Sequence, residues 1–392
     1  MSDLTNEQIS QTLVLPYLNH AVRMFESGYA SREDIDAAMR FGCGYPVGPL
    51  TALEQAGLAA VRDALAARHA ETGDHLHEPA ALLERRVADG AETIADVDAG
   101  GAAAAPELRH DIARVGVVGT GTMASGIVQV FAQAGYDVVY VGRGEDKVAG
   151  VRAFVEKSLD KLVSRGKLEE SAKGEVIGRL TGATEREALA DVDIVVEAIA
   201  EDLKIKTDLF ADLDRICKPG AILATTTSSL PITECAKATS RPESVIGMHF
   251  FNPATVMKLV EVVTTDLTSA EVDETVRALC ARVGKVAVSC GDRSGFIVNA
   301  LLFPYLNDAV MLLESGAATI EEIDAAITEQ AGFPMGPFAL LDVVGNDVSL
   351  AIQRELYAEF GEPGFAPAET LEKVVADGHL GRKTGRGFHD YS

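Results

Sequence analysis

The segment that decides the fold is ARVGVVGTGTMASGIVQVFAQAG, residues 113–135. A run of β-branched residues leads into a glycine-rich loop, and an apolar helical pattern follows it. The loop fits the pattern G-x-G-x-x-[GA] with Gly119, Gly121 and Ala124. In a strand–loop–helix context this pattern is typical of dinucleotide-binding units, whose helix N-terminus offers N–H donors to the phosphates. The residues predicted to meet the nucleotide here are Gly119, Gly121, Thr122, Met123 and Ala124.

Short β-rich runs alternate with helical stretches in the centre of the chain. After the first strand, the runs are DVVYV, DIVVEAI, AILATTT and VIGMHFF, in chain order. Strands that are separated by helical patterns indicate a parallel sheet with crossover helices. We therefore predict an α/β Rossmann-type domain with a doubly wound sheet over residues 112–294.

The stretch VVYVGRGEDK, residues 138–147, bears on the choice of cofactor. A dinucleotide-binding unit usually has an acidic residue roughly 20 residues after the loop, at the end of its second strand. Here that position is Gly142, followed by Arg143. No carboxylate is present to accept from two ribose hydroxyls, whereas Arg143 can pair with a 2′-phosphate, assisted by Lys147. We favour NADP(H); the alternative is an NAD site that tolerates the loss, with Arg143 solvated or stacked on adenine.

Three candidate catalytic side chains lie in or after strand-like runs. Ser228 follows AILATTT, at the carboxyl edge where open α/β sheets bind ligands. His249 lies in the apolar run VIGMHFF, and Glu261 lies in the apolar run MKLVEVV. A buried carboxylate is costly unless it is paired, and a strand histidine is its natural partner. Taken alone, a strand histidine is more often a core residue. Beside a nucleotide fold, the pair is favoured as a general base for a secondary alcohol whose hydride leaves for nicotinamide.

The chain contains an internal repeat. LVLPYLNHAVRMFESGYASREDIDAA matches LLFPYLNDAVMLLESGAATIEEIDAA without a gap. Pro16 and Pro304 are 288 positions apart, and so are Asp36 and Asp324. Both copies have apolar residues at helical spacing, interrupted by Gly and Pro. A gapless match of this length indicates two copies of one all-α domain.

The repeat sets the domain boundaries that we predict. We expect a helical domain at 1–92, a linker rich in Ala, Gly and Asp at 93–111, and a second helical domain at 295–392. The first copy has Gln11 where the second has Asn299, and it lacks the basic tail GRKTGRGFHDY. We therefore expect only the C-terminal copy to serve a site, although drift at the ends of a domain would leave the same pattern.

Composition narrows the classes of partner. The formal net charge of −24 disfavours nucleic acid and anionic membranes. No stretch approaches the roughly 18 apolar residues of a membrane span, and the N-terminal MSDLTNEQIS has no basic run before an apolar core. The five cysteines are scattered, without C-x-x-C pairs or zinc-spaced histidines. We expect reduced thiols, no metal site and a cytoplasmic protein.

Several motifs, in order, resemble those of a known family. The runs TSSLPI, HFFNPATVMKLVEVV, GFIVNALLFPYLNDA, GFPMGPFALLDVVG and GRKTGRGF are similar to those of the 3-hydroxyacyl-CoA dehydrogenases, especially the short-chain 3-hydroxybutyryl-CoA type. The resemblance covers about residues 114–391. It implies interconversion of (S)-3-hydroxyacyl-CoA and 3-oxoacyl-CoA by hydride transfer with NAD(P), in fatty acid metabolism.

The resemblance also implies roles for individual residues. It makes His249 the catalytic base and Glu261 its partner, and it assigns Ser228 to the substrate side and Asn299 to the reacting carbonyl. The implied cofactor contacts beyond the glycine-rich loop are Glu201, Lys206, Asn252 and Lys383. The implied coenzyme A contacts are Ser158, Arg165 and Lys167.

The chain departs from the family pattern in three places. Gly142 replaces the ribose-binding Asp, Thr226 stands where the family usually has Asn, and the module at 1–90 is additional. In the family the C-terminal helical domain forms the dimer contact, so the extra copy can replace the partner subunit in a monomeric pseudo-dimer. A homodimer with a leftover duplication is the alternative. The rival functions are a dehydrogenase of acyl-carrier-protein thioesters or of a hydroxy acid, and a non-catalytic scaffold.

Overall fold

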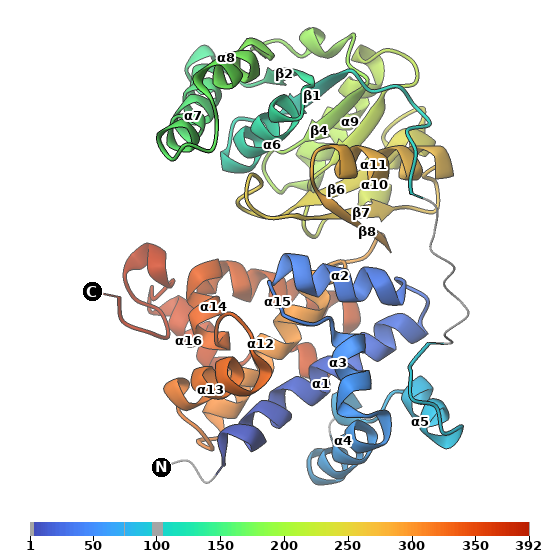
Figure 1. The fold of residues 1–392 in the computed structure, drawn as a ribbon, viewed down its shortest axis with the longest axis vertical. Coiled ribbons are helices and arrows are strands. Elements are labelled where there is room, and N and C mark those ends of the chain that lie inside the picture. Colours follow the sequence, from blue (N-terminus) through green and yellow to red (C-terminus); the bar gives the residue numbers. More distant parts are fainter. Residues whose placement is uncertain (1–3, 74, 96–104, 392) are drawn as a thin grey trace. The chain divides into compact units, whose positions relative to one another are not determined.

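The structure is a computed structural model that describes residues 4–73, 75–95 and 105–391. The chain divides into two compact units. One, the Rossmann unit, is Ala103–Arg293; the other, the helical unit, combines Met1–Ala102 with Ser294–Ser392. The blue and orange-red ribbons of Figure 1 distinguish the two parts of the helical unit. No described helix is long and apolar enough to cross a lipid bilayer.

Eight strands form one sheet in the described part of the Rossmann unit. They are β1 Arg114–Val118, β2 Asp137–Val141, β3 Leu180–Ala183, β4 Ile194–Glu197, β5 Ile222–Thr225, β6 Val245–Phe250, β7 Leu259–Thr264 and β8 Val286–Gly291. Their order is β3-β2-β1-β4-β5-β6-β7-β8, and only the β6–β7 pair is antiparallel among them. The order reverses between β1 and β4, the switch point at which doubly wound sheets bind ligands. The predicted Rossmann-type fold is confirmed.

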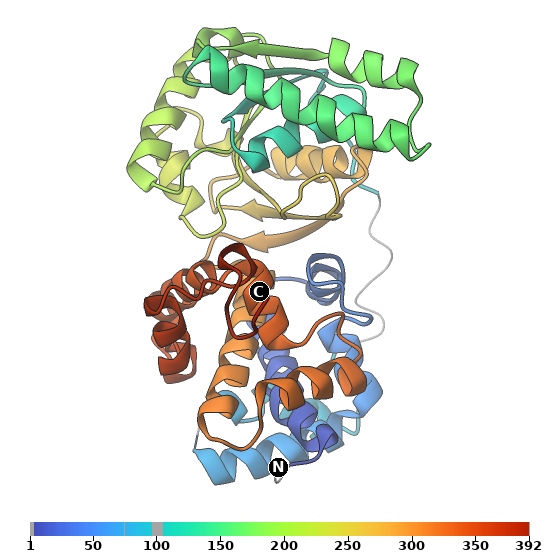
Figure 2. The ribbon, with the colours of Figure 1, turned by 90° about the vertical axis from the view of Figure 1, so that its left-hand side faces the viewer.

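Helices cover both faces of this sheet. They are α6 Thr122–Gln133, α7 Glu145–Ser164, α8 Glu170–Gly178, α9 Leu203–Ile216, α10 Ile232–Lys237 and α11 Ala270–Arg282. Helices α6, α7 and α11 share one apolar core with alternate strand residues, among them Met248 and Val262; Figure 2 shows α6 (teal) and α7 (green) lying along this face. Successive strand residues point to opposite faces. His249 and Glu261 therefore point to the opposite face, where α10 packs on β6.

The helical unit consists of two copies of one fold. The first copy has α1 Asn6–Glu26, α2 Arg32–Gly42, α3 Pro49–Ala56, α4 Leu58–Thr72 and α5 Ala81–Ala88. The second has α12 Val298–Glu314, α13 Ile320–Ala326, α14 Pro337–Val344, α15 Asn346–Phe360 and α16 Glu369–Ala376. Each long first helix contains an internal proline, Pro16 in α1 and Pro304 in α12.

The two copies repeat individual hydrogen bonds. Asp36 accepts from two backbone N–H groups at the start of α3, at 2.8 and 3.1 Å, and Asp324 does the same for α14 at 2.9 and 3.1 Å. Asn19 accepts from the N–H that precedes α5 at 2.8 Å, and Asn307 accepts from the N–H that precedes α16 at 2.9 Å. These pairs share the offset of the sequence repeat, so the duplication extends to side-chain geometry.

The copies pack against each other around an aromatic cluster. Tyr17 on α1 and Tyr305 on α12 have ring centroids 6.0 Å apart, and Tyr45 stacks on Phe333 at 3.7 Å. Each pair joins equivalent positions of the repeat. Figure 1 shows α1 running beside α12 and α13, which it contacts. Equivalent surfaces that meet each other form an isologous interface, the kind that builds twofold dimers, but here it lies within one chain.

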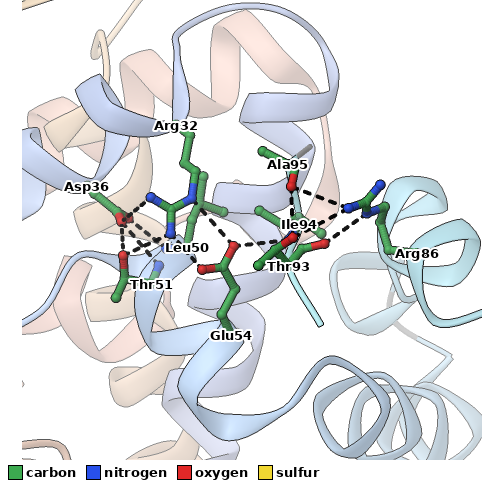
Figure 3. A network of polar contacts seen from close by, with 9 residues as sticks. All are labelled: Arg32, Asp36, Leu50, Thr51, Glu54, Arg86, Thr93, Ile94 and Ala95. Atoms are coloured by element: carbon green, nitrogen blue, oxygen red, sulfur yellow. Dashed lines mark hydrogen bonds and ion pairs between the residues drawn. The ribbon is translucent and has the colours of Figure 1, made fainter. Parts of the chain in front are cut away.

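The first copy ends in a network that fixes the start of the predicted linker. Arg32 donates to Glu54 at 2.6 Å, and Glu54 accepts from the N–H of Ile94 at 3.0 Å. Arg86 donates to the backbone carbonyls on either side of Ile94, at 2.8 and 3.3 Å (Figure 3). The side chain of Ile94 is buried. Residues 96–104, the centre of the predicted linker, lie outside the described residues.

The second copy uses the matching position for its basic tail. Asp342, the equivalent of Glu54, accepts from the N–H groups of Phe388 and His389 at 2.9 and 2.8 Å. The tail therefore folds back onto α14. The first copy instead closes this region with its own short segment around Ile94, so the two copies differ where the sequence differs.

Candidate active site

The glycine-rich loop connects β1 to α6 at the switch point of the sheet. Gly119 has a φ of +134°, and a Cβ there would lie 2.3 Å from the carbonyl oxygen of Ala198, so glycine is required. A Cβ on Gly121 would meet nothing within 4 Å, and no side chain caps α6 at this residue. Ala124 is buried beneath the loop. An open backbone at the start of α6 fits the pyrophosphate of a dinucleotide.

A cavity of about 550 Å³ opens over this loop. Its lining includes the predicted residues Gly119, Gly121, Thr122, Met123, Gly142 and Arg143. Lys147 does not line it, whereas Arg186, which the sequence gave no reason to select, does. None of the described lining residues is acidic. Arg186 pairs with Asp212, and no described carboxylate forms an ion pair with the exposed Arg143.

Gly142 lies at the end of β2, directly beside the glycine-rich loop. A Cβ at this position would lie 2.4 Å from Cγ2 of Thr120 and 3.2 Å from Cγ2 of Val148. The Thr120 methyl group therefore occupies the space in which an acidic side chain at position 142 would begin. The packing of the glycine-rich loop therefore favours glycine over an acidic residue at position 142.

His249 and Glu261 meet across neighbouring strands. They are directly opposite each other in the antiparallel β6–β7 pair, and Nδ1 of His249 lies 2.7 Å from Oε2 of Glu261. Glu261 is fully buried and His249 is 8% exposed. A carboxylate at Nδ1 fixes the tautomer and stabilises the imidazolium, so Nε2 is the nitrogen suited to exchange a proton with a substrate. The structure thus brings together the two residues that the sequence paired.

Ser228 lies in the loop after β5, at the carboxyl edge of the sheet. No described group forms a hydrogen bond with its hydroxyl, whereas its backbone N–H donates to Glu201 at 3.0 Å. Thr226, two residues earlier, accepts from the N–H of Phe250 at 3.3 Å. This bond ties the end of β5 to the end of β6, one residue after His249. The departure at Thr226 therefore has a structural role in joining the two segments.

The exposed Glu201 contacts a buried ion pair that Lys206 forms with Glu197. Lys206 donates to Glu197 at 2.7 Å and lies 3.2 Å from Glu201. Burial opposes ionisation of Glu201, but the charge of Lys206 and the hydrogen bonds from Thr227 and Ser228 outweigh it and lower the pKa of this carboxyl. Lys206 is only 1% exposed, so its ammonium group faces protein carboxylates.

The remaining predicted residues of the Rossmann unit lie on its surface. Asn252 is exposed in the loop between β6 and β7. Ser158 is half-buried on α7, Arg165 is the exposed C-cap of that helix, and Lys167 is exposed just beyond it. These three coenzyme A candidates therefore share the last turns of α7 and the segment after it.

Asn299 and Lys383 belong to the helical unit. Asn299 lies in the first turn of α12 and is half-buried, and no described group forms a hydrogen bond with its amide. Lys383 pairs with Asp347 at 2.5 Å. At the position that corresponds to Asn299, the first copy has the exposed Gln11, whose amide donates to Glu7 at 3.3 Å. The two copies thus present different side chains at this position.

Comparison with known proteins covers both units. A family model described as "3-hydroxyacyl-CoA dehydrogenase, NAD binding domain" matches residues 114–293. A second, "3-hydroxyacyl-CoA dehydrogenase, C-terminal domain", matches twice, at residues 9–98 and 295–391. The chain belongs to the 3-hydroxyacyl-CoA dehydrogenase family. The family-level resemblance inferred from the motifs is therefore confirmed.

Relatives in this family align along almost their whole length. A 3-hydroxybutyryl-CoA dehydrogenase of Clostridioides difficile is 46% identical, covering 71% of this chain and 99% of its own. The mitochondrial hydroxyacyl-coenzyme A dehydrogenase of Homo sapiens is 43% identical, and the alignment covers 75% of this chain and 96% of the human protein. The crystal structure of (S)-3-hydroxybutyryl-CoA dehydrogenase from Ralstonia eutropha has a TM-score of 0.71 at 41% identity. The match covers 72% of this chain and 100% of that structure. This chain thus has more sequence than these relatives, and its second match to the C-terminal domain accounts for the addition.

Proposed function

We propose that the protein interconverts (S)-3-hydroxyacyl-CoA and 3-oxoacyl-CoA, with a short acyl chain. The observation that carries this proposal is the buried His249–Glu261 pair in the same unit as the dinucleotide cavity. The names of the relatives support a thioester substrate, because several are 3-hydroxybutyryl-CoA dehydrogenases. When bound, the nicotinamide dinucleotide supplies the hydride acceptor or donor. The side chains of the protein transfer the proton and orient the substrate.

His249 accepts and donates the proton of the reaction. In the oxidative direction, Nε2 takes the proton of the 3-hydroxyl group as the C–H bond gives up its hydride. The positive charge that develops on the imidazole is stabilised by Glu261 at Nδ1. In the reductive direction the imidazolium returns the proton to the carbonyl oxygen. Ser228, whose hydroxyl forms no hydrogen bond to described groups, is suited to donate to that oxygen.

Activity toward acetoacetyl-CoA tests the substrate class. The protein is assayed with acetoacetyl-CoA, with the same acyl group on acyl carrier protein, and with free acetoacetate, by the absorbance of the reduced nicotinamide. We expect turnover of the coenzyme A thioester, with the exposed Arg165 and Lys167 favouring its phosphates. Activity confined to the carrier-protein thioester or the free acid would overturn the choice of substrate. No turnover of any of them would favour the scaffold alternative.

We also propose that this NAD-binding domain prefers NADP(H). Two observations support the preference: no acidic residue is among the described residues that line the cavity, and Arg143 and Arg186 both line it. A 2′-phosphate requires a cationic partner in a chain of net charge −24. Arg143 is the better candidate because Arg186 already pairs with Asp212.

The ratio of NADPH to NADH use tests the preference. Arg143→Ala is expected to lower kcat/KM for NADPH and leave that for NADH nearly unchanged. Arg152→Ala is a matched control, because Arg152 is an exposed arginine on α7 that pairs with Glu156 at 3.0 Å and does not line the cavity. A wild type that prefers NADH would overturn the proposal.

We further propose that the chain works as a monomer in which the first helical copy replaces a partner subunit. The internal isologous contact around Tyr17 and Tyr305 supports this, because it covers the surface that a second subunit would use. Light scattering is expected to give the mass of one chain, 41.4 kDa. A stable dimer would contradict it.

We also propose a cytoplasmic location, because the five free cysteines fit a reducing compartment. Fractionation of cells would test it.

A further inference from the structure

The two copies of the helical unit meet through pairs of equivalent residues. Beside the aromatic cluster, a Cβ on Gly44 would lie 3.6 Å from Cγ of Pro334, and a Cβ on Gly332 would lie 3.7 Å from Cγ of Pro46. The two glycines are 288 positions apart in the sequence, and so are the two prolines. One contact is thus formed twice, as it is in a twofold dimer.

One pair of equivalent positions departs from this symmetry. The first copy has Leu76, and the second copy has Gly364, 288 residues later. Each lies in the middle of a short 3₁₀ helix, His75–His77 in the first copy and Pro363–Phe365 in the second. A Cβ on Gly364 would lie 2.7 Å from Cγ of Leu76 and closer still to its Cδ1. The leucine side chain therefore occupies the space that a side chain at position 364 would need.

The backbones around the two positions are held in the same way. Nδ2 of Asn19 donates to the carbonyl of Glu78 at 2.8 Å, and Nδ2 of Asn307 donates to the carbonyl of Ala366 at 2.9 Å. These bonds also share the offset of the repeat. Gly364 lies in a 3₁₀ helix and does not have a positive φ, so its backbone accepts a side chain. The two positions therefore differ in side-chain size alone.

Leu76 fills the space beside Gly364 almost completely. Its side chain is buried although it belongs to a three-residue helix. The cavity that remains between the copies here measures about 10 Å³, and its walls include Leu76, Tyr17 and Tyr305. Two glycines at these positions would leave a void, and two leucines would overlap. The contact is therefore complementary only between a first copy and a second copy.

We propose that Leu76 and Gly364 form a knob and a hole that make this surface selective for the unlike copy. The inference deepens the proposed monomer and rests on it, because the unlike copy is part of the same chain. If the second copies of two chains met through this surface, two glycines would face each other, and the void between them would weaken the contact. The pair thus favours the internal contact and disfavours a second chain as partner.

Exchanging the two residues tests the fit in the full chain. Gly364→Leu sets two leucines against each other, and Leu76→Gly leaves a void, so each single variant is expected to melt about 4–10 °C below the wild type. The double variant Leu76→Gly/Gly364→Leu reverses knob and hole, and it is expected to melt near the wild-type temperature. Gly174→Leu is the matched control: this exposed glycine on α8 would place its Cβ within 4 Å of nothing, so no loss of stability is expected.

Hydrogen exchange assigns the effect to the contact between the copies. The amides of α1 and α12 are expected to exchange faster in both single variants and at the wild-type rate in the double variant. A double variant that is no more stable than either single variant would overturn the knob and hole, because each residue would then serve only its own copy. So would a Gly364→Leu variant with wild-type melting and exchange.

The failure of this inference is distinguishable from the failure of the proposed monomer. Light scattering on the wild type decides whether the chain is a monomer, and the stability of the double variant decides whether the two residues fit each other. A wild-type dimer would remove the selectivity for the internal contact, even where the double variant is rescued.

Discussion

The contact between Thr120 and position 142 leads to a prediction about cofactor engineering. Substituting Gly142 by Asp places a Cβ 2.4 Å from Cγ2 of Thr120. The backbone of Gly142 does not have a positive φ, so the cost is steric alone. Threonine is stiff at χ1 and cannot easily turn its methyl group away. Overpacking of this kind costs about 1–3 kcal/mol.

A second substitution is expected to relieve the clash. Thr120→Ala removes Cγ2, so the nearest remaining atom to the new Cβ is Cγ2 of Val148 at 3.2 Å, a contact that a small shift of this side chain relieves. The new carboxylate can then accept from ribose hydroxyls and repel a 2′-phosphate. Charge-assisted hydrogen bonds contribute about 1.5–3 kcal/mol, so the NADPH-to-NADH affinity ratio should fall by about 10- to 100-fold.

Dissociation constants for both cofactors and melting temperatures are measured on four proteins: the wild type, Gly142→Asp, Thr120→Ala and the double variant. Gly142→Asp alone should melt lower, by about 2–4 °C for each kcal/mol, without a full change of preference. Thr120→Ala alone should keep the wild-type preference. A Gly142→Asp variant that is as stable as the wild type and binds NADH as well as the double variant does would contradict the predicted clash with Thr120.

Three further predictions follow from other contacts. Glu261→Gln removes the charge that stabilises the imidazolium, so kcat/KM should fall by at least about tenfold while the fold is kept; an unchanged rate would remove Glu261 from the mechanism. Asn19→Ala and Asn307→Ala should each cost about 1–3 kcal/mol of unfolding free energy, because both leave buried backbone groups unpaired; a loss confined to one of them in urea titrations would show that the copies are not equivalent. The folded pKa of Glu201 is lowered, so its contribution to stability is complete above its unfolded pKa of about 4.3 and is lost as the pH falls through the lower folded value. Urea unfolding of Glu201→Gln should therefore converge on the wild type only in acid.

The sequence was sufficient where local chemistry decides the structure. The glycine-rich loop has one workable backbone, since Gly119 adopts a positive φ and Gly121 leaves its helix open. A buried Glu261 needs a partner, and the strand pairing that sets it opposite His249 follows from two apolar runs that each carry one polar residue. The repeat was visible because the residues that form the repeated hydrogen bonds, such as Asp36 and Asp324, are identical in the two copies.

Other features depend on tertiary packing and could not be predicted from patterns in the sequence. Strand β3 has the sequence LTGA, which is short and contains Gly182, so it did not look like a strand. The burial of Lys206 follows from the side chains packed around α9, since an early lysine in a helix is usually solvated. Arg186 reaches the dinucleotide cavity from a segment distant in sequence from the glycine-rich loop. The contact of Thr120 with position 142 links two adjacent strand ends, and hydrophobic periodicity in the sequence does not predict such a contact.

The variant His249→Gln removes the general base that we propose. Glutamine keeps a polar side chain of similar length but cannot act as a general base near neutral pH. We predict that the variant binds the dinucleotide and acetoacetyl-CoA with wild-type affinity while its kcat falls by about 10²- to 10⁴-fold. A variant that retains most of the wild-type kcat would contradict the claim that the buried His249–Glu261 pair carries the chemistry of this protein.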